Sequence, residues 1–162
     1  HESLSKIVKS NKVDSNFDFV HDTIKKTYDS KKMGRMIVGQ NWKKQDQNMK
    51  DEFIKVFEKY IAYNYIRRFS KLKKIEFEIL NTKIIGEKYK LTNVNLLTNS
   101  KDKISISYLL HLTENEWKIF DVLIDGSISE VATKKAEFTD TINNNGLRQL
   151  ISILKKKSKL IN

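Results

Sequence analysis

The stretch that decides the fold is KISISYLLHLTENEWKIFDVLI, residues 103–124. Every second residue from Ile104 to Leu112 is apolar, with Leu109 the one apolar residue between them, and a second apolar run follows after the short polar link TEN. A period of two is typical of a β-strand with one buried face, and a link of three residues suits a hairpin. The stretch therefore predicts two antiparallel strands. The apolar face of the first strand carries Ile104, Ile106, Tyr108, Leu110 and Leu112.

Two further strand patterns precede this pair, KIEFEIL at 74–80 and KYKLTNVNLLT at 88–98. The links GEK and NSKDK separate the patterns and are again short and polar. Short links join strands that run in opposite directions, because parallel neighbours need a long crossover. The sequence thus predicts an antiparallel meander of four strands.

Helical spacing dominates on both sides of the strands. Apolar residues recur every three or four positions, which predicts helices over 15–32, 33–42, 46–72, 129–145 and 147–162. In the long third helix, apolar side chains surround most of the circumference between Tyr60 and Ile66. Such a helix must be covered on several sides, by a sheet, by other helices or by a ligand. Ordinary core packing and a ligand site are both open at this point.

Composition bounds the class of protein. The 162 residues suit a single domain, and the chain has no apolar run of the ~18 residues that a membrane helix needs. The opening HESLSKIVKS is too polar for a signal peptide, although a processed chain has the same appearance. Absence of cysteine excludes disulfides and thiol chemistry. The net charge of +11 indicates either anionic partners or a coding bias toward lysine, and both explanations stay open.

Residues suited to catalysis are few. The three histidines have no metal-ligand spacing, and no nucleophile elbow, dinucleotide motif or P-loop occurs. His111 and Asp121 lie on neighbouring predicted strands with Tyr108 nearby, which is the one candidate acid-base group. Strict alternation places Tyr108 and His111 on opposite faces, so the group does not converge. We interpret Asp121 as a hydrogen-bonding residue near the end of the sheet and Asp125 as a turn residue.

Nucleic-acid binding is the other function that the charge suggests. The lysines are scattered through all predicted elements and cluster only at 71–74 and 155–157. The aromatic residues fall on predicted core faces instead of between basic residues, where they would stack on bases. This distribution favours a solvated basic surface over a nucleic-acid site.

Three segments together resemble one protein family. They are VGQNWKK at 38–44, EFIKVFEKYIAYNYIRRF at 52–69 and WKIFDVLIDGSISEVATKKAEFTDTINNNGLRQLISIL at 117–154. Their order and spacing are similar to those of the MlaC family, also called the toluene-tolerance auxiliary family, and the resemblance covers roughly 33–155. Two positions depart from the family pattern. Lys135 stands where the family often has arginine, and the turn at 126–129 differs from the family's Gly-Val-Ser.

The resemblance implies an α+β fold in which 1–162 form one lipid-binding domain. A curved antiparallel sheet, similar to nuclear-transport-factor-like domains, is expected to enclose an apolar cavity together with N-terminal and C-terminal helices. Family members are periplasmic, monomeric and non-enzymatic, and they carry glycerophospholipid without a cofactor or metal. They exchange it with an outer-membrane lipoprotein complex and with an inner-membrane ABC transporter that has an MCE-domain subunit.

The expected lipid-contacting residues follow from the apolar faces described above. They are Val38, Trp42, Phe53, Phe57, Tyr60, Ile61, Ile104, Ile106, Tyr108 and Leu110. Lys135 and Arg148 are expected at the head group or at a docking surface. Two alternatives belong to other classes of protein. One is a small isomerase or dehydratase that uses Asp121 and His111, and the other is an adaptor with a filled core and no ligand.

Overall fold

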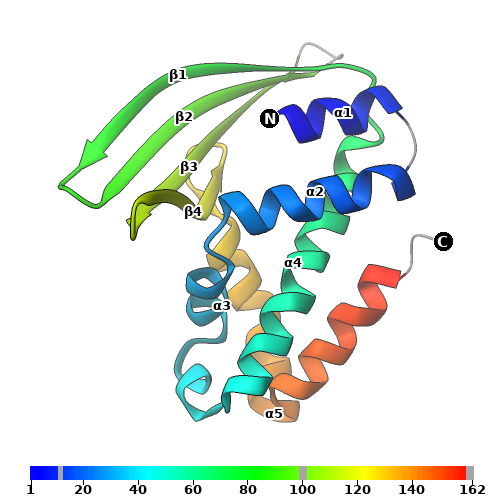
Figure 1. The fold of residues 1–162 in the computed structure, drawn as a ribbon, viewed down its shortest axis with the longest axis vertical. Coiled ribbons are helices and arrows are strands. Elements are labelled where there is room, and N and C mark those ends of the chain that lie inside the picture. Colours follow the sequence, from blue (N-terminus) through cyan, green and yellow to red (C-terminus); the bar gives the residue numbers. More distant parts are fainter. Residues whose placement is uncertain (11–12, 99–101, 160–162) are drawn as a thin grey trace.

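The structure is a computed structural model that describes residues 1–10, 13–98 and 102–159. The helices are α1 (Glu2–Ser10), α2 (Val13–Thr27), α3 (Ser30–Val38), the 3-10 helix η1 (Gly39–Lys44), α4 (Gln47–Phe69) and α5 (Glu130–Lys159). The strands are β1 (Ile75–Ile85), β2 (Tyr89–Thr98), β3 (Lys103–Thr113), β4 (Glu116–Ile124) and β5 (Ile128–Ser129). The fold is α+β, and the curved sheet lies across one end of the helices (Figure 1).

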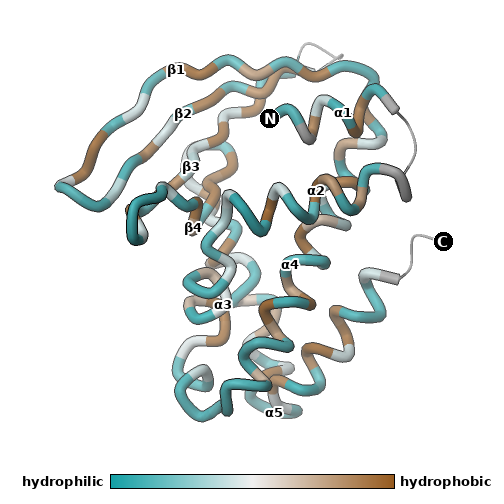
Figure 2. Tube along the Cα trace, in the orientation of Figure 1, coloured by the Kyte–Doolittle hydropathy of each residue, from teal (hydrophilic) through white to brown (hydrophobic). Residues whose placement is uncertain are grey.

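The sheet is an antiparallel meander in the order β1-β2-β3-β4-β5, as the sequence predicts for its first four strands. Hydrophobic and hydrophilic residues alternate along the long strands (Figure 2). The register shifts at Leu80 of β1, between Ile79 and Asn81, and at Phe120 of β4, opposite Leu109 and Leu110 of β3. Bulges of this kind bend the strands and increase their twist, which gives the sheet its concave inner face. Residues 99–101 of the predicted second link lie outside the described residues.

The single helix predicted over 15–32 is wrong. The helix α2 ends at Thr27, Tyr28 forms an isolated parallel bridge with Ile119 of β4, and α3 begins at Ser30. The Asp29 carboxylate accepts a hydrogen bond from the Lys32 backbone N–H at 2.8 Å, which caps the start of α3. The second carboxylate oxygen lies 2.8 Å from His111 Nε2 on β3. Contacts with the sheet therefore break the helical pattern at this point.

The helix α4 contacts α1, α2, α3 and α5, and two hydrophobic clusters meet along it. Its first half, with the fully buried Phe53, packs against α3, η1 and α5. Its second half, with the fully buried Ile66, packs against α1, α2 and the sheet. The wide apolar surface of this helix is thus covered on several sides, as expected. Only the second half lies beside the sheet (Figure 1).

The two terminal segments of the fold differ in how well the sequence predicts them. The helix α5 consists of two helical halves that meet at Gly146, so the predicted break there is confirmed, and 160–162 of the predicted last helix lie outside the described residues. The helix α1 was not predicted, because the segment is polar overall. Its residues Leu4, Ile7 and Val8 nevertheless have helical spacing and pack into the second cluster. Among the described residues, no helix is long and apolar enough to cross a membrane.

Candidate functional site

A cavity lies between the concave face of the sheet and the helices α3, α4 and α5. Its volume is about 490 Å³. From α4 it is lined by residues spaced three and four apart, which is one face of that helix: Phe57, Tyr60, Ile61, Asn64, Tyr65, Arg68 and Phe69. The strands contribute the inward-facing side chains Leu96, Ile104, Ile106, Tyr108, Val122 and Ile124. The alternation of the strands and the period of the helix thus point apolar groups at the same space.

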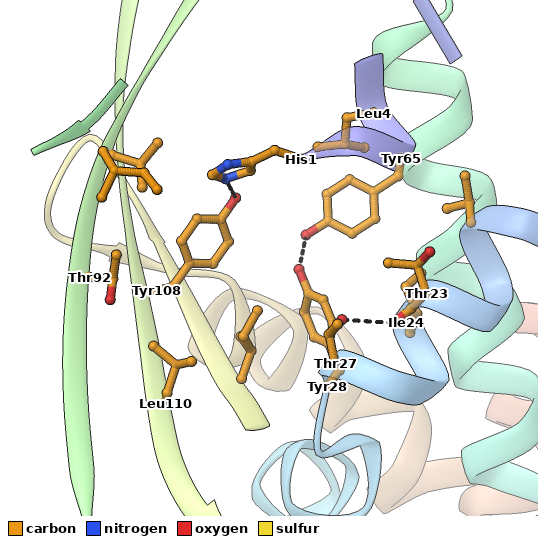
Figure 3. A pocket seen from close by; sticks show the side chains of 14 residues that line it. His1, Leu4, Thr23, Ile24, Thr27, Tyr28, Tyr65, Thr92, Tyr108 and Leu110 are labelled. Carbon is orange, nitrogen blue, oxygen red and sulfur yellow. Dashed lines mark hydrogen bonds between the residues drawn. The ribbon is translucent and has the colours of Figure 1, made fainter. Parts of the chain in front are cut away.

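A smaller cavity of about 270 Å³ lies between α1, α2 and the concave face of β1–β4 (Figure 3). The helix α2 contributes Val20, Thr23, Ile24 and Thr27, and the strands contribute Ile79, Thr92, Val94, Leu110 and Ile119. The polar groups of this lining are hydroxyls and the His1 ring, and no acidic or basic side chain other than histidine occurs among these residues.

Four side chains line both cavities and separate them: Leu4, Tyr28, Tyr65 and Tyr108. The hydroxyls of Tyr28 and Tyr65 are hydrogen-bonded at 2.6 Å (Figure 3). The Tyr108 hydroxyl lies 3.2 Å from His1 Nε2, and the His1 ring stacks on Phe77 of β1. We call these four residues the aromatic partition. It is built from α1, the junction of α2 and α3, α4 and β3.

The hydroxyls of the partition are uncharged. Burial raises the pKa of Tyr28 well above its ordinary value, and the neighbouring Tyr65 and Tyr108 raise it further. Burial also raises the pKa of Tyr65 and of Tyr108. All three phenols stay protonated at neutral pH, so the walls of both cavities are apolar or neutral over most of their area. Such a lining suits an apolar ligand with a few polar groups.

Charged groups gather at one side of the larger cavity, where Arg68, Glu130 and Lys134 belong to its lining. Arg68 Nη1 lies 4.0 Å from Glu130 Oε1. The Lys134 ammonium donates to Glu137 at 2.7 Å and lies 5.5 Å from the centre of the Tyr60 ring. Partial burial lowers the pKa of Lys134, but the hydrogen bonds to Glu137 and Tyr60 outweigh it and the net shift is upward. Two cations and one carboxylate thus border a space whose remaining lining is mostly apolar.

The structure places most of the expected lipid-contacting residues at these cavities. Phe57, Tyr60, Ile61, Ile104, Ile106 and Tyr108 line the larger cavity, and Tyr108 and Leu110 line the smaller one. Val38, Trp42 and Phe53 line neither, and lie in the helical cluster, where the Trp42 and Phe53 rings are 6.3 Å apart. The reason is their position along the chain, because α4 reaches the sheet only after Phe53 and α5 covers its earlier turns.

The expected cations lie elsewhere. Lys135 and Arg148 are exposed and line neither cavity, because Lys135 extends toward Gly39 and Arg148 lies near Glu52. Lys134 and Arg68 border the larger cavity instead. A signal for Arg68 was present, since the line of Phe57, Tyr60, Ile61 and Asn64 continues to position 68 at helical spacing. No such signal distinguishes Lys134 from Lys135.

Asp121 and His111 are not brought together. Asp121 accepts hydrogen bonds from the Ser129 hydroxyl at 2.6 Å and from the Val131 backbone N–H at 3.1 Å, and so holds the start of α5. His111 lies opposite Lys118 in the register and is bonded to Asp29. The interpretation of Asp121 as a hydrogen-bonding residue at the end of the sheet is confirmed. In the described part of the chain, no three His, Asp or Glu side chains gather as metal ligands would.

Comparison with known proteins agrees with this architecture. A phospholipid-binding protein from Ralstonia solanacearum, solved in complex with a phospholipid, is similar in structure with a TM-score of 0.83. The two share 16% sequence identity, and the similarity covers 98% of this chain and 91% of that one. At this identity the likeness shows the fold alone. No curated protein matches the chain. The family model for the MlaC protein matches residues 2–156, and the chain therefore belongs to the MlaC family.

Proposed function

We propose that the chain is a non-enzymatic carrier of glycerophospholipid that holds acyl chains in the two cavities beneath the sheet. The observation that carries this proposal is the pair of neighbouring apolar cavities in a member of the MlaC family. The likeness of the fold to a protein solved with a bound phospholipid supports it. Phe57, Ile61 and Ile104 contact the acyl chains, while Arg68 and Lys134 contact the phosphate of the head group.

A carrier of this kind needs a suitable cavity and no reactive residue. Exposing a lipid with on the order of 30 methylenes to water costs ~0.8 kcal/mol for each, or ~24 kcal/mol in all, which makes spontaneous desorption slow. An apolar cavity removes most of that cost because the chains leave one apolar surrounding for another. Transfer is then close to neutral, and small differences in affinity set its direction.

The finer parts of the proposal concern location and partners. The carrier acts in the periplasm as a single monomeric domain without a cofactor. It exchanges lipid with an outer-membrane lipoprotein complex and with an inner-membrane ABC transporter that has an MCE-domain subunit. Lys135 and Arg148, both exposed on α5, are assigned to docking instead of to the head group. The net charge of +11 draws the carrier toward anionic surfaces.

The test is native mass spectrometry of the purified protein, followed by extraction and analysis of the released lipid. We expect a stoichiometric adduct with the mass of a phospholipid. The substitution Phe57→Asp places a charge in the cavity and should abolish the adduct. Because Phe57 is only 2% exposed and its loss also weakens the core, Ile104→Trp provides a second variant that obstructs part of the larger cavity from the sheet.

A matched control is Ile84→Trp, since Ile84 is 70% exposed on β1 and lines neither cavity. This variant should retain the adduct. Asp121→Asn should also retain it, because the Asp121 side chain itself lines neither cavity. A wild-type protein that carries no lipid and takes none up from vesicles would refute the carrier and favour an adaptor. Loss of lipid in Ile84→Trp as well as in Ile104→Trp would refute the assigned cavity.

A further inference from the structure

We propose that the aromatic partition of Leu4, Tyr28, Tyr65 and Tyr108 is a gate that limits the length of acyl chain the protein accepts. Closed, it confines a chain to the larger cavity. Open, it lets the chain continue into the smaller one. This inference rests on the proposed function, since it concerns the specificity of the same site.

The position of the partition is the first observation. Its four residues are common to the linings of both cavities, so an extended chain that crosses from one cavity to the other passes directly beside them. The cavities differ in volume, about 490 Å³ against about 270 Å³. The state of the partition therefore decides whether the smaller volume adds to the capacity of the larger.

The second observation concerns the interactions that hold the partition closed. Tyr28 and Tyr65 are joined by one hydrogen bond of 2.6 Å between their hydroxyls, and their rings meet edge to face with centroids 6.4 Å apart. Tyr65 is held on α4, next to the Phe69 ring. Tyr28 belongs to the two-residue junction of α2 and α3, which is not helical. Rotation of the Tyr28 side chain opens the passage without unfolding a helix.

The surroundings of the pair determine which state is favoured. Both rings line cavities with mostly apolar walls, where an unpaired hydroxyl has few polar side chains as alternative partners. Burial keeps both phenols protonated, so the bond between them persists through neutral pH. The closed state is thus favoured by the hydroxyl bond, while the gain from burying further methylenes favours the open state.

The experiment measures selectivity for chain length. Delipidated protein is mixed with phosphatidylglycerols of increasing acyl-chain length, and the bound species are quantified by native mass spectrometry. The double variant Tyr28→Phe and Tyr65→Phe removes both hydroxyls and keeps both rings. We expect its preference for long over short chains to exceed that of the wild type by about threefold to tenfold, which is the value of one such hydrogen bond.

A matched control is Tyr63→Phe. Tyr63 lies on α4 two residues before Tyr65, packs on the Phe17 ring and lines neither cavity. Its chain-length preference should equal that of the wild type. A further variant adds Leu110→Trp to the double variant and obstructs the smaller cavity from β3 with a larger side chain. This addition should remove the increased preference for long acyl chains and leave the binding of lipids with short acyl chains intact.

The outcomes separate the gate from the carrier. If wild type and double variant both bind phosphatidylglycerol with the same chain-length preference, the gate is refuted and the carrier stands. A gain for long chains that persists after Leu110→Trp also refutes the gate, because the chain then does not enter the smaller cavity. If neither the wild type nor any variant binds phosphatidylglycerol, the proposed function itself is refuted.

Discussion

Tyr28 connects the sheet, the helix α4 and the two cavities. Its backbone bridges to Ile119 of β4, its hydroxyl bonds Tyr65 of α4, and its ring lines both cavities. The neighbouring Asp29 caps α3 and bonds His111 on β3. The junction of α2 and α3 is therefore tied both to the sheet and to the central helix. Substitutions at this junction should therefore change both the cavities and the free energy of unfolding.

The raised pKa values of Tyr28 and Tyr65 predict a loss of stability in alkaline solution. Their ordinary value is 10.0, and both are higher in the folded protein. Above pH ~10 the unfolded chain releases these protons while the folded chain keeps them, so the free energy of unfolding falls as pH rises. Each tyrosine contributes a slope of up to about 1.4 kcal/mol per pH unit until pH reaches its folded pKa.

Urea denaturation across this pH range measures the effect. Other groups also titrate there, so the comparison is with the double variant Tyr28→Phe and Tyr65→Phe, whose free energy of unfolding should fall less steeply above pH ~10. Below pH 9 the curves of the two proteins should run parallel. Equal slopes above pH 10 would show that the folded pKa values of the two tyrosines are not raised.

Single residues also mark the limit of what the sequence predicts about the site. Ile104, Ile106 and Tyr108 follow from alternation alone, and the structure places all three at the larger cavity. Trp42 and Phe53 carry equally apolar side chains at helical spacing, yet they face other helices. Periodicity shows which face of an element is buried but not what covers it. That is why the adjacent Lys134 and Lys135 could not be told apart.

At the scale of elements, α5 depends on a backbone conformation at one position. Gly146 has φ 79° and ψ 168°, a region that is essentially restricted to glycine. It lets the second half of α5 turn and bring Leu147, Leu150 and Leu154 into the helical cluster. The two halves pack as separate helices because of this one residue.

We therefore predict that Gly146→Ala destabilises the protein by about 1–3 kcal/mol. Among the described residues, and apart from the chain neighbours and the backbone of α5 itself, no heavy atom lies within 4 Å of the position that the new Cβ would occupy, so the cost comes from backbone strain and not from a clash. Denaturant unfolding measures it, with the exposed neighbour substitution Asn145→Ala as a control that should stay within about 0.5 kcal/mol of wild type. An unchanged stability in Gly146→Ala would show that the bend tolerates ordinary residues.

The prediction of helices and strands fails where contacts between residues far apart in the sequence determine the bounds of an element. The four long strands follow from alternation and short links, because these are local properties of the chain. The break between α2 and α3 does not, since helical spacing continues through Tyr28 and Asp29 while their partners Ile119 and His111 lie far along the sequence. The helix α1 does not follow from the sequence for a local reason. Its apolar residues Leu4, Ile7 and Val8 are too few to dominate a polar segment.

At the scale of the whole molecule, the two hydrophobic clusters differ in how completely side chains fill them. One lies among α3, η1, α4 and α5 and is filled by side chains such as Phe53 and Leu154. The other joins α1, α2 and the second half of α4 to the sheet, and the smaller cavity lies within it. Unfilled apolar space forfeits packing contacts and destabilises a fold. A ligand that fills this space should restore those contacts.

We therefore predict that removal of lipid lowers stability and that phospholipid restores it. Ligand that binds only the folded state adds about 2.7 kcal/mol at a free concentration of 100 Kd. The check is thermal unfolding of delipidated protein titrated with phosphatidylglycerol, where Tm should rise with the logarithm of lipid concentration. Ile104→Trp, whose larger ring occupies part of the larger cavity, should start from a Tm closer to that of the lipid-bound wild type and rise less. A wild-type Tm that does not change with lipid concentration while the adduct is present would contradict the prediction, because it would mean that the lipid binds the unfolded chain as tightly as the folded one.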